Sequence, residues 1–219
     1  NLSEILTMLG GALIGYPLAL LPLQILWMNL ITDVFPALAL AVEPGEPDVM
    51  DRPPVDPDQP IIGRRLVRLI GGYGFLLTLC TLAAFLYGVH TRGYQNEAAG
   101  TYPAVTFSFL TIAFGQLAHV FNCRKEDEPM HLRDWLSNLW MIGALALSAG
   151  LMLLAVYVPF LSRILKTVQP TATDWLVILG LASVPMVFGQ SWRWLVRIIG
   201  SDSLAEPAPH HGPLEETNQ

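Results

Sequence analysis

Long apolar segments alternate with short polar connections along this chain, a pattern typical of a membrane protein. A short apolar run, 1–16, comes first and is too short to cross a bilayer as a helix. The runs that reach the required length, about 20 residues, are 20–42, 65–89, 103–123, 136–160 and 173–190. The pattern predicts an all-α polytopic membrane protein, a bundle of about six transmembrane helices in which the first is incomplete.

Two polar segments of the chain have a composition that argues against packed structure. The connection 43–62 is dense in proline, which predicts a stiff, extended loop rather than a helix. Residues 199–219 are polar and rich in Pro and Glu, which predicts a disordered tail. Residues 1–198 are therefore expected to form one transmembrane domain.

Composition agrees with membrane insertion. The chain is 53% hydrophobic and 14% charged, with a mean hydropathy of +0.46. Lys and Arg are concentrated in alternate connections, which predicts that 43–64, 124–135 and the C-terminal tail are cytoplasmic. The net charge of −6 and the absence of a basic stripe argue against nucleic-acid binding.

The run 20–42 carries polar side chains in its middle. Its only ionisable side chain before Glu43 is Asp33, and a carboxylate at bilayer depth costs several kcal/mol unless it faces a partner, water or an ion. Asn29 and Thr32 precede it at helical spacing and would share its face. Pro36 would break the helix and free the carbonyl of Thr32. Together these groups are the ligand set of a hard cation. The alternative is an acid that only packs against other helices, next to an ordinary proline kink.

Asn1 and Glu4 repeat this arrangement in the first run, because an amide and a carboxylate three residues apart share one helical face. Three further motifs follow: Pro22-x-Gln24-Ile25-Leu26-Trp27-x-Asn29-Leu30-x-Thr32-Asp33, Pro36-Ala37-x-Ala39-Leu40 and Pro47-Asp48-x-Met50-Asp51-Arg52-Pro53-Pro54. In this order and spacing they resemble the C-terminal membrane half of P-type cation-transporting ATPases. The resemblance is greatest to the type II group, which contains the sarcoplasmic-reticulum calcium pumps and their bacterial relatives.

The resemblance implies that the chain holds part of helix five through helix ten of such a pump. Asn1 and Glu4 fall on the fifth-helix cation ligands. Asn29, Thr32 and Asp33 fall on the sixth-helix ligands, and Pro36 on the position that follows an unwound stretch. The loop residues Asp48, Asp51 and Arg52 would contact the phosphorylation domain and couple it to the cation site.

One position departs from the calcium pumps that carry two ions. Their eighth helix supplies a further glutamate, where this chain has Ala113. Gln116 is a candidate ligand on the same helix, with interhelical hydrogen bonding as the alternative role. His119 is expected to be structural. The loss of a carboxylate favours one calcium per cycle or a different cation.

The resemblance also implies partners outside this sequence. The phosphorylation motif, the nucleotide-binding segment, the dephosphorylation loop and the first four helices do not occur in it, so catalytic residues and the Mg-ATP site are expected elsewhere in the full polypeptide. Raised pKa values of clustered carboxylates after cation release would favour proton countertransport. Calcium is the expected cation, with sodium, potassium and manganese as alternatives. A bacterial inner membrane is the expected location. A cation-coupled secondary carrier and a non-transporting membrane scaffold are the rival functions.

Overall fold

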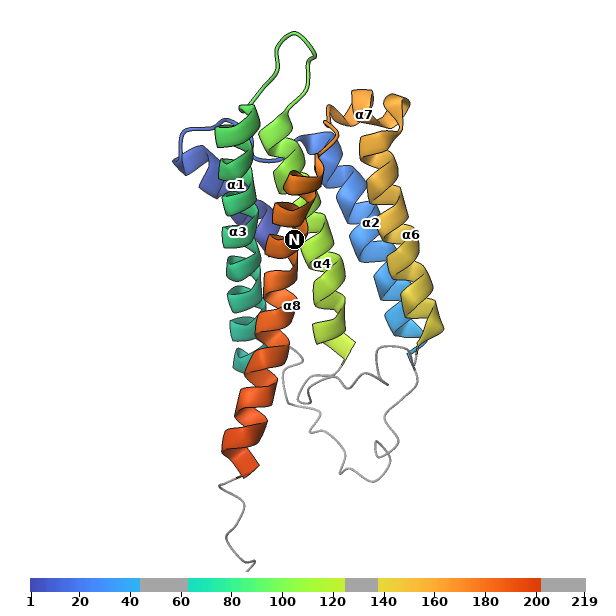
Figure 1. Cartoon of the computed structure of the whole chain (residues 1–219). Helices are drawn as coiled ribbons and strands as arrows, with labels where there is room; N and C mark the ends of the chain where they lie inside the picture. Colours follow the sequence, from blue (N-terminus) through green and yellow to red (C-terminus); the bar gives the residue numbers. More distant parts are fainter. Residues whose placement is uncertain (44–62, 125–137, 202–219) are drawn as a thin grey trace, which may run out of the picture.

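The described residues, 1–43, 63–124 and 138–201 of a computed structural model, form an all-helical bundle (Figure 1). One isolated bridge joins Asn96 to Thr101 in the connection between two long helices. The helices of this described part are α1 (Leu2–Leu13), α2 (Pro22–Ala41), α3 (Arg64–Arg92), α4 (Pro103–Arg124), α6 (Leu139–Tyr157), α7 (Pro159–Leu165) and α8 (Ala172–Ser201).

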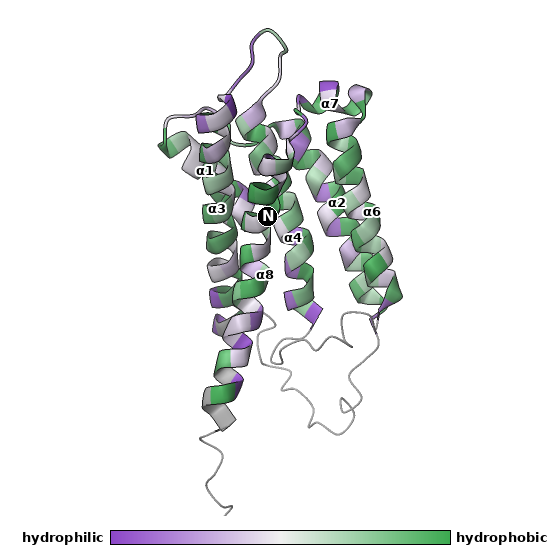
Figure 2. Ribbon diagram, in the orientation of Figure 1, coloured by the Kyte–Doolittle hydropathy of each residue, from purple (hydrophilic) through white to green (hydrophobic). Residues whose placement is uncertain are grey.

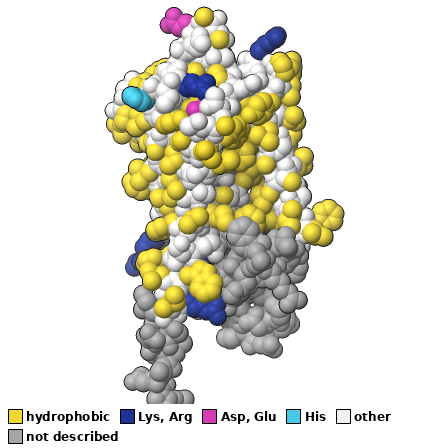
Figure 3. Space-filling view, viewed as in Figure 1, with side chains coloured by type: hydrophobic (Ala, Val, Ile, Leu, Met, Phe, Trp, Pro, Cys, Tyr) yellow, Lys and Arg dark blue, Asp and Glu magenta, His cyan; other side chains and the backbone are white. Residues whose placement is uncertain are grey.

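Five helices of the described part, α2, α3, α4, α6 and α8, are long and apolar enough to cross a membrane, whereas α1 has 12 residues. This confirms the predicted polytopic, all-α fold. Hydrophobic residues dominate the middle of the helices and polar residues gather toward their ends (Figure 2). The space-filling view likewise shows a hydrophobic band with Lys and Arg on either side of it (Figure 3).

The bundle is organised around α4, which packs against α3 and α8 on one side and α2 and α6 on the other (Figure 1). Every residue of α4 from Pro103 to Ala113 is buried. Its apolar side chains form the centre of the core with Met28 and Ile31 of α2 and Ile178 of α8. A helix that is apolar on all sides is expected in such a central position.

Close contact between α3 and α4 depends on Gly88. A Cβ at this position would lie 2.7 Å from the Cα of Ala104, which is backbone and cannot rotate away. A Cβ at Gly71, near the start of α3, would meet nothing within 4 Å. Among these glycines of α3, the one whose lack of a Cβ permits close backbone contact with α4 is therefore Gly88, near the end of the helix.

The predicted helix 136–160 is wrong at its end. Helix α6 ends at Tyr157, and Val158 has extended backbone angles (φ −83°, ψ 117°) before Pro159 opens the short helix α7. Proline disfavours helical geometry in the residue before it and lacks an N–H, so it begins a new helix instead of continuing the old one. The chain remains apolar across this boundary, which is why the hydropathy pattern does not reveal it.

The helix predicted at 173–190 is also longer in the structure, since α8 extends to Ser201. Trp192 and Arg193 therefore lie within a helix and not in a flanking segment. The predicted helix 65–89 extends likewise to Arg92 as α3. Helices can continue beyond the bilayer core, and the apolar run marks only the part that lies inside it.

The predicted break at Pro36 is wrong as well, because α2 is helical from Pro22 to Ala41 with Pro36 inside it. Proline is tolerated in a membrane helix when neighbouring groups satisfy the backbone around it. Nearby, the hydroxyl of Ser148 on α6 donates a hydrogen bond of 3.1 Å to the carbonyl of Ile31 and joins α6 to α2. The Thr32 carbonyl still loses its helical donor, since proline has no N–H.

The ends of α2, α4 and α8 lie at one end of the bundle, opposite α7 and the connection between α3 and α4 (Figure 1). The three connections predicted from Lys and Arg to share the cytoplasmic side thus begin at the same end of the molecule. Residues 44–62, 125–137 and 202–219 lie outside the described residues. The expected proline-rich loop and the disordered tail beyond Ser201 therefore remain predictions, whereas the predicted start of the tail at residue 199 is wrong, because α8 continues to Ser201.

Candidate cation site

Glu4 on α1 is the buried acid of the bundle's polar centre, with only 4% of its surface exposed. The Gln116 side chain on α4 donates from Nε2 to its Oε1 over 3.1 Å. The Asn29 amide on α2, with its nitrogen toward Glu4, lies 3.0 and 3.2 Å from the two carboxylate oxygens. Two amides from two other helices therefore stabilise one buried carboxylate, which would be costly without such partners.

Thr32 and Asp33 lie further along the same part of α2. Thr32 is buried, and its hydroxyl donates to Oδ1 of Asp33 over 3.4 Å. Asp33 itself is exposed, in contrast to the burial expected from its place in an apolar run. It shares an exposed face of α2 with Leu26 and Leu30, which no helix of the described part covers.

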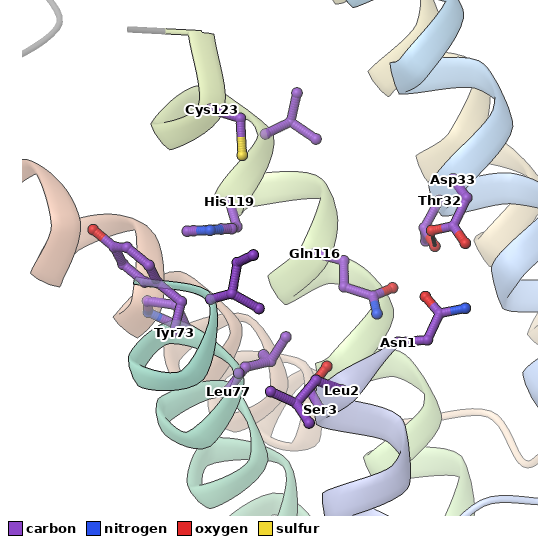
Figure 4. A pocket seen from close by; sticks show the side chains of 14 residues that line it. Asn1, Leu2, Ser3, Thr32, Asp33, Tyr73, Leu77, Gln116, His119 and Cys123 are labelled. Atoms are coloured by element: carbon purple, nitrogen blue, oxygen red, sulfur yellow. Dashed lines mark hydrogen bonds between the residues drawn. The ribbon is translucent and has the colours of Figure 1, made fainter. Parts of the chain in front are cut away.

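A cavity of about 310 Å³ joins the predicted ligands (Figure 4). Asn1 and Gln116 extend into it from α1 and α4, toward Thr32 and Asp33 on α2 (Figure 4). Four of the six residues predicted as ligands or candidate ligands thus line one space, while Glu4 and Asn29 are joined to it through Gln116 and to each other. The other residues that line the cavity are Leu2, Ser3, Ile70, Tyr73, Gly74, Leu77, His119, Val120, Cys123 and Pro185.

The two ends of the Gln116 amide have different environments. Its nitrogen bonds to Glu4, whereas its Oε1 is buried and has no hydrogen-bond partner among the described residues. An unpaired buried acceptor costs about 1–3 kcal/mol, and a cation would offset that cost. A neutral oxygen next to a carboxylate is a common ligand pair for a hard cation.

The donor set of the site is made of carboxylate, amide and hydroxyl oxygens. Among the described residues no three His, Cys, Asp or Glu side chains lie together as a metal cluster. Oxygen ligands of this kind suit calcium, magnesium or manganese better than soft metals that select thiolate and imidazole. Ala113 is fully buried and brings no oxygen from its side chain.

His119 lines the cavity, but other residues already hold its imidazole. Its Nδ1 lies 3.1 Å from Nδ2 of Asn122, and its ring lies 4.3 Å from that of Tyr73, centre to centre. Asn122 also donates to the Pro185 carbonyl and accepts from Gln190, so it joins α4 to α8. The sequence offers one signal of this network, a polar residue three positions after His119 on an otherwise apolar helix.

The predicted coupling residues Asp48, Asp51 and Arg52 lie outside the described residues. The acid that directly precedes this segment, Glu43, is described. It contacts Arg124 and Asn138 at the ends of two other helices. In the sequence, Glu43 is only the first residue of the predicted proline-rich loop 43–62.

Comparisons with known proteins agree with the architecture. Residues 17–195 match the family described as "Cation transporting ATPase, C-terminus". The chain is 40% identical over 185 residues to a protein of Bacillus subtilis (strain 168) named "Calcium-transporting ATPase". The aligned residues cover 84% of this chain and 20% of that protein. The chain is 30% identical over 200 residues to "Calcium-transporting ATPase 1" of Bacillus cereus (strain ATCC 10987 / NRS 248), covering 87% of this chain and 22% of that protein.

The chain thus spans about a fifth of the length of the curated relatives it matches. Its five spans and its bacterial relatives identify a multi-pass protein of the bacterial plasma membrane. The family match covers most of the chain and includes every described helix after α1 except the last six residues of α8. The chain belongs to the P-type cation-transporting ATPases, as their C-terminal membrane region.

Proposed function

We propose that this chain supplies the intramembrane cation site of an ATP-driven calcium pump. The observation that carries the proposal is Glu4, a buried carboxylate held by amides from α2 and α4 beside a cavity lined by Thr32 and Asp33. A buried acid at membrane depth indicates a functional site unless a partner neutralises it. Neither amide neutralises the charge of Glu4. The proposed ligands are Asn1, Glu4, Asn29, Thr32, Asp33 and Gln116.

The amides of Asn29 and Gln116 suit a site that binds and releases a cation. Each presents a donor to Glu4, and each carries an oxygen at its other end. Rotation of an amide would replace an N–H facing the carboxylate by an oxygen facing a cation. The donors would then stabilise the Glu4 carboxylate after release, and the oxygens would complete the coordination shell on binding.

The charges of the site match a single divalent ion. Glu4 and Asp33 supply two negative charges, and Ala113 adds none. Calcium is the proposed ion because the site offers oxygen ligands and because the two curated relatives are named as calcium-transporting. One calcium ion per cycle follows from the carboxylate count.

The energy for transport is proposed to come from the rest of a full-length protein. The relatives are about five times as long as the matched region, which leaves room for N-terminal helices and for actuator, phosphorylation and nucleotide domains. Mg-ATP would bind there. Asp48, Asp51 and Arg52 would transmit phosphorylation to α2, which carries Thr32 and Asp33.

ATP-dependent uptake of radioactive calcium by inside-out vesicles that contain the full-length protein tests this function. Asp33→Asn should abolish uptake, whereas Asp174→Asn, which alters an acid at the opposite end of the bundle, should leave the calcium affinity unchanged. Uptake driven by a pH gradient without ATP would indicate a secondary carrier instead. Stimulation by sodium, potassium or manganese in place of calcium would change the ion and keep the site.

Proton countertransport is a separate part of the proposal. Protons moved in the opposite direction would offset part of the charge that each calcium ion carries across the membrane. Each calcium ion that enters sealed vesicles should then be accompanied by proton release from the lumen, visible as alkalinisation with a trapped pH dye. An unchanged lumenal pH in vesicles shown to hold a pH gradient would contradict this part alone.

A further inference from the structure

The Glu43 side chain joins the ends of three helices at the predicted cytoplasmic end of the bundle. It lies two residues after the last residue of α2. Its Oε1 accepts hydrogen bonds from Arg124, the last residue of α4, at 3.1 Å from Nε and 2.5 Å from Nη2. Its Oε2 accepts from Nδ2 of Asn138, immediately before α6, over 2.5 Å. We call Glu43, Arg124 and Asn138 the Glu43 cluster.

Both partners of Glu43 are fixed to their own helices. Arg124 has only 3% of its side chain exposed, so its guanidinium is held away from water. A cation at this position also interacts favourably with the C-terminus of α4. Asn138 caps α6 by accepting from the Met141 N–H over 3.0 Å and donates to the Ala39 carbonyl in the last turn of α2 over 3.2 Å. The cluster therefore connects the end of α2 to the end of α4 and the start of α6.

The same helices carry the proposed cation ligands. Asp33 lies ten residues before Glu43, or about 15 Å along the chain if helical rise is assumed. Gln116 lies eight residues before Arg124, about 12 Å along α4. The cavity separates these two ligands, and Thr32 and Asp33 face Gln116 across it (Figure 4). A change in the position of α2 relative to α4 would alter the distance between the ligands.

We propose that the Glu43 cluster is a positioning device that holds α2 and α4 at the separation the cation site requires. The proposal rests on the proposed function for its effect on calcium, while its structural part stands alone. Glu43 and Arg124 are positioning residues in this proposal and do not contact the cation. Phosphorylation in the full-length protein would act on the site through the same contact if it displaced Glu43.

Two measurements on the purified full-length protein test the proposal. The first uses spin labels on Cys123 of α4 and on a cysteine replacing Leu38 of α2, both exposed, with other cysteines replaced. Glu43→Gln and Arg124→Gln should broaden or shift the distance distribution between the labels. Arg92→Gln is the matched control, because it breaks an ion pair of 2.5 Å with Asp174 at the opposite end of the bundle.

The second measurement is the calcium dependence of phosphorylation by ATP. Glu43→Gln should raise the half-saturating calcium concentration about tenfold and leave maximal phosphorylation unchanged. The double variant Glu43→Gln/Arg124→Gln should lose no more than the more impaired single variant, because both remove one interaction. Glu43→Asp should retain part of the calcium affinity.

Label distances that are identical in the wild-type and both variants would overturn the proposal, whatever the calcium result. An unchanged half-saturating calcium concentration in Glu43→Gln would also overturn it, because the cation site would then not depend on the cluster; a lower maximal phosphorylation alone would indicate only loss of folded protein. A wild-type protein with no calcium response would contradict the proposed function, while the label distances would still decide the structural part.

Discussion

The Gln116 amide on α4 donates a hydrogen bond of 3.1 Å to the Glu4 carboxylate on α1, although the two residues are 112 positions apart in the chain. This contact joins α4, the most buried of the five described spans, to the short helix α1. It also leaves Oε1 of Gln116 buried without a partner among the described residues. One side chain thus both stabilises the buried acid and offers an oxygen near it.

Gln116→Leu should weaken calcium binding. The substitution removes a hydrogen bond to a charged group and one candidate oxygen ligand, together worth about 1.5–3 kcal/mol, or roughly tenfold to a hundredfold in affinity. Equilibrium binding of radioactive calcium to the purified full-length protein measures the change. Gln95→Leu, in the exposed connection after α3, is the control, and equal affinities in the two variants would remove Gln116 from the site.

Gly88→Ala should destabilise the bundle by about 1–3 kcal/mol, because the added methyl group would meet the backbone of Ala104. Gly71→Ala on the same helix meets nothing within 4 Å and should be neutral or stabilising, by up to about 1 kcal/mol. Unfolding of the two purified variants in parallel measures the difference. Equal stability would mean that α3 and α4 do not approach as closely as the structure shows.

The stabilising effect of Glu43 should depend on pH. Burial raises the pKa of its carboxyl, but the hydrogen bonds from Arg124 and Asn138 and the charge of Arg124 together lower it by more. The pKa in the folded protein therefore lies below the ordinary 4.5. A depressed pKa contributes stability above pH 4.5 that is lost as the pH falls through the folded-state value. The difference in unfolding temperature between wild type and Glu43→Gln should therefore be constant near about pH 7 and shrink below pH 4.5. A difference that grew on acidification would contradict the charged contact.

Asn122→Ala should weaken the packing of α4 on α8. Asn122 is buried, donates to the Pro185 carbonyl over 3.1 Å and accepts from Gln190 over 2.8 Å. Loss of both bonds between helices should cost about 1–2 kcal/mol, since such bonds contribute modestly in membranes. Denaturant titration in detergent micelles measures the effect. Stability equal to that of Asn96→Ala, in the exposed connection, would show that water or lipid replaces these partners.

The sequence predicts the helices of this bundle because the length and composition of an apolar run are local properties. It fails where hydropathy does not change at a boundary, as at Val158, where backbone geometry before Pro159 ends α6. It fails at Pro36 for a different reason. Whether a proline breaks a membrane helix depends on the packing around it, and Pro36 is buried within the bundle.

The candidate site is predictable only within each helix. Spacing places Asn29, Thr32 and Asp33 near one another on α2, but it cannot indicate that Gln116 reaches Glu4. The exposure of Asp33 likewise depends on which helices cover α2, and spacing along one helix carries no information about that. In the sequence Glu43 is one acid among several in a polar stretch, and its importance comes from Arg124, 81 residues away.

Equilibrium calcium binding to the full-length protein, with Glu4→Gln as the test variant, is the most direct measurement of the central claim. The wild type should bind about one calcium ion per polypeptide, the number that two carboxylates can neutralise. Glu4→Gln, which keeps the shape of the side chain and removes its charge, should bind none at the same concentration while unfolding at a similar temperature. Undiminished binding by a folded Glu4→Gln protein would contradict the assignment of this buried acid to the cation site.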